Sequence, residues 1–285
     1  MDVLNASIII PTFNNFGYLQ LCLDSLKKNS KFKHEVILHI NDGHDGTLQL
    51  AKSENITYTY SSKNIGLCSS VNMASKKSTK SFILYAHDDM YFCPNWDKIL
   101  LEDLKKIQTK YFYLSGSMIQ SSGSDLILDC GNSYNNFNED KFLLNYKNIN
   151  LPDYQGSHWA PHLIHKDIWD KVNGFSEEFN PGIGSDPDLN MKLWKVGVRI
   201  FKRINNFKVY HFGSVVLRDG HKVKKNKGSK IFLNKWGISV NFFLKYFLKK
   251  NSIYDGPLQN PKKSINYYLE LFLCKINLIF LKLFK

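Results

Sequence analysis

The segment SFILYAHDDMYF, residues 81–92, joins an apolar run to two adjacent carboxylates, Asp88 and Asp89. The run FIL predicts a short buried strand that ends just before the acids. A polar turn would explain the acids, because Asp is common in turns and residues 96–107 repeat apolar side chains at helical spacing. The alternative is a ligand site at the end of a strand, and the flanking sequence bears on this choice.

The first half of the chain alternates short apolar runs with segments of helical periodicity. The apolar runs occupy residues 7–10, 35–40, 56–60 and 81–86. Such alternation predicts an α/β fold, with βαβ units on a largely parallel, Rossmann-like sheet flanked by helices. Open sheets of this kind bind ligands at the carboxyl ends of their strands. Three polar loops there become candidate sites: PTFNN (11–15), NDGHDGT (41–47) and HDDM (87–90).

The second half of the chain gives weaker signals. Residues 120–160 are rich in Ser, Asn, Gly and Asp and lack clear periodicity, so we expect loops with a few short strands. Residues 167–172 and 186–196 predict helices, and residues 207–212 predict a late strand.

Composition restricts the class of protein. A chain of 285 residues with 43% hydrophobic content can bury a large core. Its five cysteines are odd in number and form no CxxC pair, which argues against a disulfide framework or a thiolate zinc site. A reducing cytoplasm is the simplest location, and no export signal is evident near the N-terminus.

The net charge of +13 lies almost entirely in the C-terminal part. Residues 218–285 contain 15 Lys and Arg against 3 Asp and Glu, whereas residues 1–217 contain 23 against 22. We therefore divide the chain into a nearly neutral domain, 1–217, and a basic helical extension, 218–285. The extension would meet phosphate or anionic lipid, with a merely solubilising tail as the alternative.

Seven segments in order resemble the family 2 glycosyltransferases, over residues 5–217. They are ASIIIPTFNN (6–15), NDGHDGT (41–47), KNIGLCSSVNMA (63–74), FILYAHDDMYFCPNW (82–96), VNGFSEEF (172–179), GSDPDLNMKLWKVG (184–197) and VYHFGS (209–214). The resemblance implies the GT-A fold with a mixed sheet. It also implies metal-dependent, inverting transfer of a single sugar from a nucleoside diphosphate sugar to an acceptor hydroxyl, without a covalent intermediate.

The resemblance aligns Asp88 and Asp89 with the end of the DxD-type motif that holds a metal ion. Carboxylates suit Mn²⁺ or Mg²⁺, which would stabilise the diphosphate as it leaves. Ala86 stands where many members carry the first acid, so either carboxylate could be the direct ligand. His211 matches a further metal contact, whereas His87 is expected to shape the loop, with metal binding as the alternative. We expect the acidic pair to lie on an exposed loop.

The resemblance also implies a nucleotide site. It places Pro11, Thr12, Phe13 and Asp42 in loops that contact the base and ribose, although NDGHDGT would also make an ordinary turn. Further candidates for nucleotide contacts are Lys63, Asn64, Gly66 and Asp88.

Asp186 begins the predicted helix 186–196, where an acid could simply cap the helix or complement its dipole. In the resembling enzymes this segment carries the general base that deprotonates the acceptor, and the matching residue is Asp186. Ser185 stands where an acid is often found. Acceptor contacts are expected around residues 156–162, where Trp159 is either a sugar-stacking platform or a core residue.

Two other functions compete with this interpretation. The basic tail with its aromatic side chains would suit a nucleic-acid-associated protein, although no nucleic-acid module is recognisable and no nucleic-acid partner is expected. A sugar nucleotidyltransferase would share the architecture, but its Gly-rich, Arg-containing N-terminal loop is absent. Processive synthases are excluded because the chain lacks both a QxxRW segment and an uncharged apolar span of 18 residues.

Residues 266–285 predict an amphipathic helix that lies on an anionic membrane. Its polar residues gather on one half of the circumference: Asn266, Glu270, Lys275, Asn277, Lys282 and Lys285. The alternative is that its apolar stripe packs on the catalytic domain or on a second subunit. With a glycan or lipid-linked acceptor, the protein would work in surface glycan or glycolipid assembly, in the cytoplasm or on the inner face of a membrane.

Overall fold

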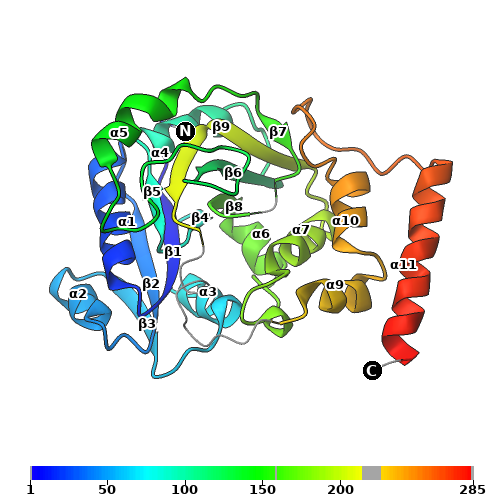
Figure 1. The fold of residues 1–285 in the computed structure, drawn as a ribbon, viewed down its shortest axis with the longest axis horizontal. Coiled ribbons are helices and arrows are strands. Elements are labelled where there is room, and N and C mark those ends of the chain that lie inside the picture. The colour runs from blue at the N-terminus through cyan, green and yellow to red at the C-terminus, as the bar shows by residue number, and fades with distance from the viewer. Residues whose placement is uncertain (1, 158, 214–225, 284–285) are drawn as a thin grey trace.

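The structure is a computed structural model that describes residues 2–157, 159–213 and 226–283 (Figure 1). Its strands are β1 (Ala6–Phe13), β2 (Glu35–Asn41), β3 (Thr57–Ser61), β4 (Phe82–Tyr85), β5 (Met90–Phe92), β6 (Phe112–Ile119), β7 (Tyr154–Gln155), β8 (His162–His165) and β9 (Ile200–His211). They form one sheet in the order β3-β2-β1-β4-β8-β6-β9-β5, and β7 pairs with β9. Strands β3, β2, β1 and β4 are parallel, whereas β8 is antiparallel to both β4 and β6. The predicted mixed α/β sheet is confirmed.

Helices flank the sheet, and the C-terminal helices lie to one side of it (Figure 1). They are α1 (Phe16–Asn29), α2 (Thr47–Ser53), α3 (Leu67–Ser75), α4 (Trp96–Leu104), α5 (Glu139–Asn145), α6 (Lys166–Lys171), α7 (Ser185–Lys195), α9 (Gly228–Trp236), α10 (Val240–Phe242) and α11 (Ile265–Leu283). In α1, Leu19, Cys22 and Leu26 recur at helical spacing, and all three are buried against the core. Burial of this stripe holds the helix on the sheet.

The central strands are buried on both faces. Ile8, Ile9 and Ile10 of β1 and Ile83 and Leu84 of β4 have no exposed surface. A continuous apolar run is what a strand covered by helices on both faces requires, so these runs specify the middle of the sheet. A second, aromatic cluster lies beneath α5.

The structure differs from the sequence-based expectations in the second half. Strand β9 begins at Ile200 instead of residue 207, and its early part contains Lys202, which pairs with Asp103 and Asp153 at 2.5 and 2.7 Å. A lysine interrupts the apolar pattern of a buried strand, so the sequence did not predict this part of β9. The two ion pairs compensate the buried charge. Helix α5 lies in a region expected to contain only loops and short strands, and the side chain of Asn138 caps it.

The C-terminal helices lie together on one side of the sheet (Figure 1). Helix α11, predicted from residue 266, is present, and it packs against α9 through a stripe centred on Cys274, which is 5% exposed. The predicted boundary between residues 217 and 218 falls outside the described residues, as does Lys285.

Candidate active site

The loops after β1 and β2 are tied together at the carboxyl edge of the sheet. The Asn14 amide donates to an Asp42 carboxylate oxygen at 3.1 Å, and its carbonyl oxygen accepts from the Gly43 backbone at 3.0 Å. Asn14 and Asp42 both have positive φ, at 46° and 65°, a conformation that Asn and Asp tolerate better than most residues. Asp42 is thereby held beside the end of β1, as a nucleotide site there would require.

The predicted nucleotide-site residues of the first segment belong to β1 itself. Pro11 and Phe13 are half-buried, and Thr12 is buried. They are therefore held by the sheet and not by a loop, which corrects the sequence-based expectation. Their position at the carboxyl end of the strand is as expected.

The loop before α3 lies next to these strands. Asn41 at the end of β2 accepts from the Ile65 backbone at 3.0 Å and so fixes this loop. Asn64 accepts from the Gly66 backbone at 2.8 Å, and Gly66 has a φ of 85°. A Cβ on Gly66 would come within 2.5 Å of Asn180, so the close approach requires glycine. Lys63 is exposed.

The acidic pair is buried. Asp88 is 6% exposed and Asp89 is 3% exposed, so the expectation of an exposed loop is wrong. Burial and the neighbouring charge of Asp89 raise the pKa of Asp88 to about 7, although the nearby Thr12 and Asn15 side chains oppose this shift. Two adjacent carboxylates that are buried together repel one another when ionised, and a nearby cation would offset this repulsion.

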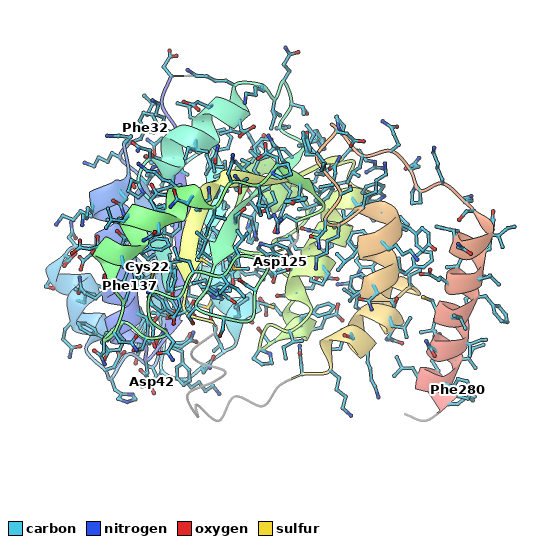
Figure 2. The ribbon with its side chains drawn as sticks, turned by 45° about the horizontal axis from the view of Figure 1, so that its top comes forward. Cys22, Phe32, Asp42, Asp125, Phe137 and Phe280 are labelled. Atoms are coloured by element: carbon cyan, nitrogen blue, oxygen red, sulfur yellow. The ribbon has the colours of Figure 1, made fainter. Side chains whose placement is uncertain are left out.

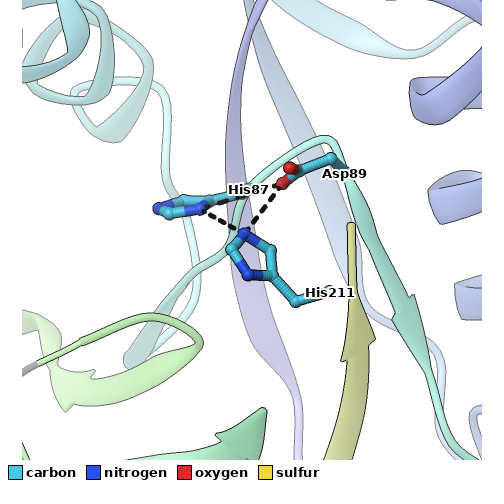
Figure 3. Close-up of side chains that lie close together, drawn as sticks. All are labelled: His87, Asp89 and His211. Carbon is cyan, nitrogen blue, oxygen red and sulfur yellow. Dashed lines mark hydrogen bonds and ion pairs between the residues drawn. The ribbon is translucent and has the colours of Figure 1, made fainter. Parts of the chain in front are cut away.

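Asp89 forms a cluster with two histidines (Figure 3). His211 Nε2 lies 3.3 Å from Asp89 Oδ1 and 3.4 Å from His87 Nδ1, and His87 Nδ1 lies 3.9 Å from the same carboxylate oxygen. The three potential ligand atoms lie within 4.8 Å of one another. Residues 124 positions apart thus present one oxygen and two nitrogens toward a common point, which is a donor set suited to a divalent cation.

The cluster carries features that prepare it for a cation. Burial lowers the pKa of His87 to about 4, so its ring is neutral at neutral pH, and the neutral imidazole is the metal-binding form. The side-chain amide of Gln120, just after β6, lies 2.7 Å from His211 Nδ1 and orients the ring. With its oxygen turned toward Nδ1, the amide accepts a hydrogen bond from the Nδ1 proton and leaves Nε2 for a cation. Ser214, expected in the adjoining turn, lies outside the described residues.

Asp186 lies in the first turn of α7, as predicted. Gly184, with a φ of 87°, allows the sharp entry into the helix. The Oδ1 atom of Asp186 is buried and, among the residues that the structure describes, has no hydrogen-bond partner. Burial raises the pKa of Asp186 to about 7, which is the range in which a carboxyl can exchange a proton with a substrate.

Tyr85 connects the acidic pair with α7. Burial raises its pKa well above the ordinary value, and the charges of Asp186, Asp88 and Asp89 raise it further. Both groups of carboxylates therefore act on one buried phenol at the end of β4. The predicted metal and base residues come from distant segments, and both lie near enough to Tyr85 for their charges to raise its pKa.

The predicted acceptor region borders α7 as well. The Asn190 amide donates to the Ser157 carbonyl at 2.9 Å, and the Tyr113 hydroxyl lies 2.9 Å from His162 Nδ1. Trp159 carries two cations over its ring, Arg203 at 5.6 Å and Lys250 at 5.2 Å. His158 lies outside the described residues.

A model of the Glycosyl transferase family 2 matches residues 7–162, more than half of the chain. The chain belongs to glycosyltransferase family 2. An uncharacterized glycosyltransferase of Rickettsia prowazekii is 32% identical over 108 residues, which are 36% of this chain and 33% of the relative.

Solved structures share the fold of this family 2 glycosyltransferase. Residues 1–349 of Staphylococcus aureus TarS in complex with UDP give a TM-score of 0.55 at 17% identity, over 73% of this chain and 60% of that one. A mannosyltransferase of Pyrobaculum calidifontis in complex with GDP-Man and Mn²⁺ gives 0.51 at 12% identity, over 81% and 60%. The chain thus spans less than two thirds of each of these proteins, and the predicted GT-A-like fold is confirmed.

The sequence did not predict several residues of this candidate site. Asn14 and Asn41 follow predicted strands, and their position at strand ends could have marked them as candidate site residues. Gln120 carried no signal, because its role depends on a contact with a residue 91 positions away. His87, for which loop shaping was favoured over metal binding, lies with Asp89 and His211 in the cluster that could hold a cation.

Proposed function

We propose that the chain is a metal-dependent, inverting glycosyltransferase that moves one sugar from a nucleoside diphosphate sugar to an acceptor hydroxyl. The observation that carries this proposal is the His87–Asp89–His211 cluster, which lies beside Tyr85 in a family 2 fold. Asp186 lies near enough to Tyr85 for its charge to raise the pKa of the phenol. A donor diphosphate and an acceptor hydroxyl need these two kinds of group on either side of the transferred sugar.

The cluster would hold the metal ion. Asp89, His211 and His87 supply the donor atoms, and the two imidazoles favour Mn²⁺ over Mg²⁺, which prefers oxygen ligands. A divalent cation bound there supplies positive charge to the diphosphate leaving group. Asp88 stays the second candidate ligand, because its Oδ2 is buried and, among the described residues, has no hydrogen-bond partner.

The neighbouring loops would bind the nucleotide. The Asp42 carboxylate could accept hydrogen bonds from the base or ribose, and Asn14 holds it in place. Pro11, Thr12 and Phe13 would line the same side, with Asn64 and Gly66 opposite. Exposed Lys63 would add positive charge near the phosphates.

Asp186 would act as the general base. Its ionised carboxylate takes the proton of the acceptor hydroxyl while the hydroxyl oxygen attacks the sugar carbon, and the bond to the diphosphate breaks in the same displacement. The absence of a hydrogen-bond partner on Oδ1 within the described part of the chain supports this role, because that oxygen stays available for a hydroxyl.

Related proteins suggest donors to test. TarS has been solved with UDP and with UDP-GlcNAc, and the mannosyltransferase with GDP-Man and Mn²⁺. We propose a glycan or lipid-linked acceptor and a role in polysaccharide or glycolipid assembly. The nucleic-acid alternative loses support because Phe232 and Phe242 of the tail are at most 2% exposed and cannot stack on bases.

Calorimetric titration with UDP, GDP, dTDP and CMP, each with and without Mn²⁺, tests the proposal. We expect one nucleoside diphosphate to bind at least tenfold more tightly with Mn²⁺ than without it. The sugar donor that contains this nucleoside diphosphate should be hydrolysed slowly when no acceptor is present. Absence of Mn²⁺-dependent binding for all four nucleotides would refute the metal-dependent mechanism.

We further propose that the protein works in the cytoplasm on the inner face of a membrane, bound through the outward face of α11. Eight of the seventeen exposed large apolar side chains among the described residues lie on this helix: Ile265, Tyr268, Leu269, Phe272, Leu273, Ile279, Phe280 and Leu283. At about 100° per residue they fall within an arc of about 140°. Phe280 lies toward the far end of the helix (Figure 2).

The opposite stripe of α11 is already covered. Cys274 is buried there, and Tyr267 and Leu271 pack against the core. The face that packs on the domain is therefore not the broad apolar stripe, which stays exposed. No helix in the described part of the chain is long and apolar enough to span a bilayer.

Positive charge beside the outward face of α11 favours binding to an anionic bilayer. Lys275 and Lys282 lie along one edge of the arc, and Lys262 and Lys263 precede the helix, all four exposed. Glu270 points to the covered side, where it pairs with Lys245. Lysines beside an apolar face can reach lipid headgroups while the apolar side chains insert.

Vesicle co-sedimentation tests this surface with a matched control. The variant Leu269→Glu/Phe272→Glu should lose binding to vesicles containing phosphatidylglycerol, whereas Leu144→Glu, at an exposed site on α5, should bind like the wild type. Equal binding by both variants, or none by the wild type, would exclude the membrane. A dimer that only the double variant dissociates would assign the face to a second copy.

A further inference from the structure

We infer that α9, in the C-terminal extension, positions the helix that carries the general base. Lys235 and Trp236 of α9 bind the Asp188 carboxylate, and this contact holds Asp186 in position. This inference rests on the proposed role of Asp186 as the base. It extends the functional unit beyond the residues 7–162 that the family model matches.

The link between the helices is a buried carboxylate. Asp188 has no exposed surface, and its Oδ1 accepts from Trp236 Nε1 at 2.8 Å and lies 2.9 Å from Lys235 Nζ. Asp188 lies two residues after Asp186 in the first turn of α7. A carboxylate held by two donors of another helix fixes the rotation and height of that turn.

Lys235 also holds the segment that leads into α7. Its ammonium lies 2.7 Å from Glu178 and donates to the Ser176 hydroxyl at 2.8 Å. The side chain is only 24% exposed, so three acceptors surround one largely buried charge. Moving α9 would therefore release both Asp188 and the turn before it.

Close contacts with backbone carbonyls bring the start of α9 and the residue two positions before it against the same turn. The Asn226 amide donates to the carbonyls of Phe179 and Ile183 at 2.6 and 3.1 Å. A Cβ on Gly228 would come within 2.0 Å of the Ile183 carbonyl oxygen, so only glycine allows this approach. The C-terminal segment thus covers the entry to α7 through side-chain and backbone contacts alike.

The opposite side of this entry is held by α3. Asn180 accepts from the backbone of Cys68 at 3.0 Å and donates to the Ser69 hydroxyl at 2.7 Å. The turn before Asp186 is therefore clamped between α3 and α9. Loss of the α9 contacts would leave one side unsupported, and small displacements of a base cost large factors in rate.

Two variants test this clamp against a control on the same helix. Trp236→Phe keeps an aromatic ring but removes the N–H donor, Lys235→Met removes the charge, and Lys230→Met changes an exposed lysine. We expect the first two to increase amide hydrogen exchange in residues 182–190 and to lower the transfer rate at least tenfold. Binding of the Mn²⁺–nucleotide pair that the wild type prefers should change less than twofold, and Lys230→Met should match the wild type.

The outcomes separate this inference from the proposed function. Unchanged exchange and rate in Trp236→Phe would overturn the clamp even if Lys235→Met fails to fold. A raised acceptor KM at unchanged kcat would instead make α9 a substrate contact and also overturn it. Failure of the wild type to transfer any sugar would remove the proposed function, while the exchange measurement would still report whether α9 holds α7.

Discussion

Lowering the pH from 8 to 6 should slow sugar transfer about tenfold, because the base Asp186 becomes protonated. Burial raises its pKa to about 7, so the carboxyl is almost wholly ionised at pH 8 and only about one tenth ionised at pH 6. Only the ionised form can accept the acceptor proton. The rate should therefore rise with pH and level off above about pH 8.

The assay is initial-rate transfer at saturating donor and Mn²⁺ between pH 5.5 and 8.5. Saturation matters because Asp88 also has a pKa of about 7 and could change donor binding over the same range. The matched variant Asp186→Asn should bind the nucleotide normally and transfer at least a hundredfold more slowly at every pH. A rate that stays flat through pH 6–8 at constant donor occupancy would refute the assignment.

The same carboxyl makes a prediction about stability. A pKa raised from 3.8 to about 7 means that the folded chain holds this proton more tightly than the unfolded chain. Its contribution to stability is present below pH 4 and is lost as the pH rises through 7, by at most about 4 kcal/mol. Asp186→Asn should consequently unfold at a higher temperature than the wild type at pH 8 and by a smaller margin at pH 5.

Two further predictions concern the metal cluster. Asp89→Ala should lower Mn²⁺ affinity at least tenfold in calorimetry, and Asp88→Ala should do so only if Asp88 is a ligand. If both variants bind Mn²⁺ as tightly as the wild type, the acidic pair is not part of the metal site. Gln120→Leu should weaken Mn²⁺ binding by about tenfold to a hundredfold, because the His211 ring is no longer held in place. The control variant Gln120→Glu keeps an acceptor oxygen and should bind Mn²⁺ nearly as tightly as the wild type. Unchanged Mn²⁺ affinity in Gln120→Leu would contradict the orienting role of Gln120.

The site was partly readable because it depends on strand ends. Strand-ending loops in a parallel sheet meet at one edge, so PTFNN, NDGHDGT and HDDM were placed together by alternation alone. Asp186 was assigned as the base through the family resemblance, because an acid in a first helical turn is by itself explained by helix capping. Gln120 and the α9 contacts were not found, and a loop-shaping role was favoured for His87, because each acts on a residue about 50 to 120 positions away.

Local patterns in the sequence determined the parallel half of the sheet, the polar strand ends and the two-faced character of α11. Periodicity reports burial whenever the buried residue is apolar, so these features needed no knowledge of distant segments. Tertiary structure alone decided where charges are buried. Lys202 belongs to a strand because Asp103 and Asp153 neutralise it, and Asp89 is buried beside His211 although its sequence favours an exposed turn. Burial of a charge depends on partners that only folding brings together, and these partners decide whether a polar residue forms a turn or a site.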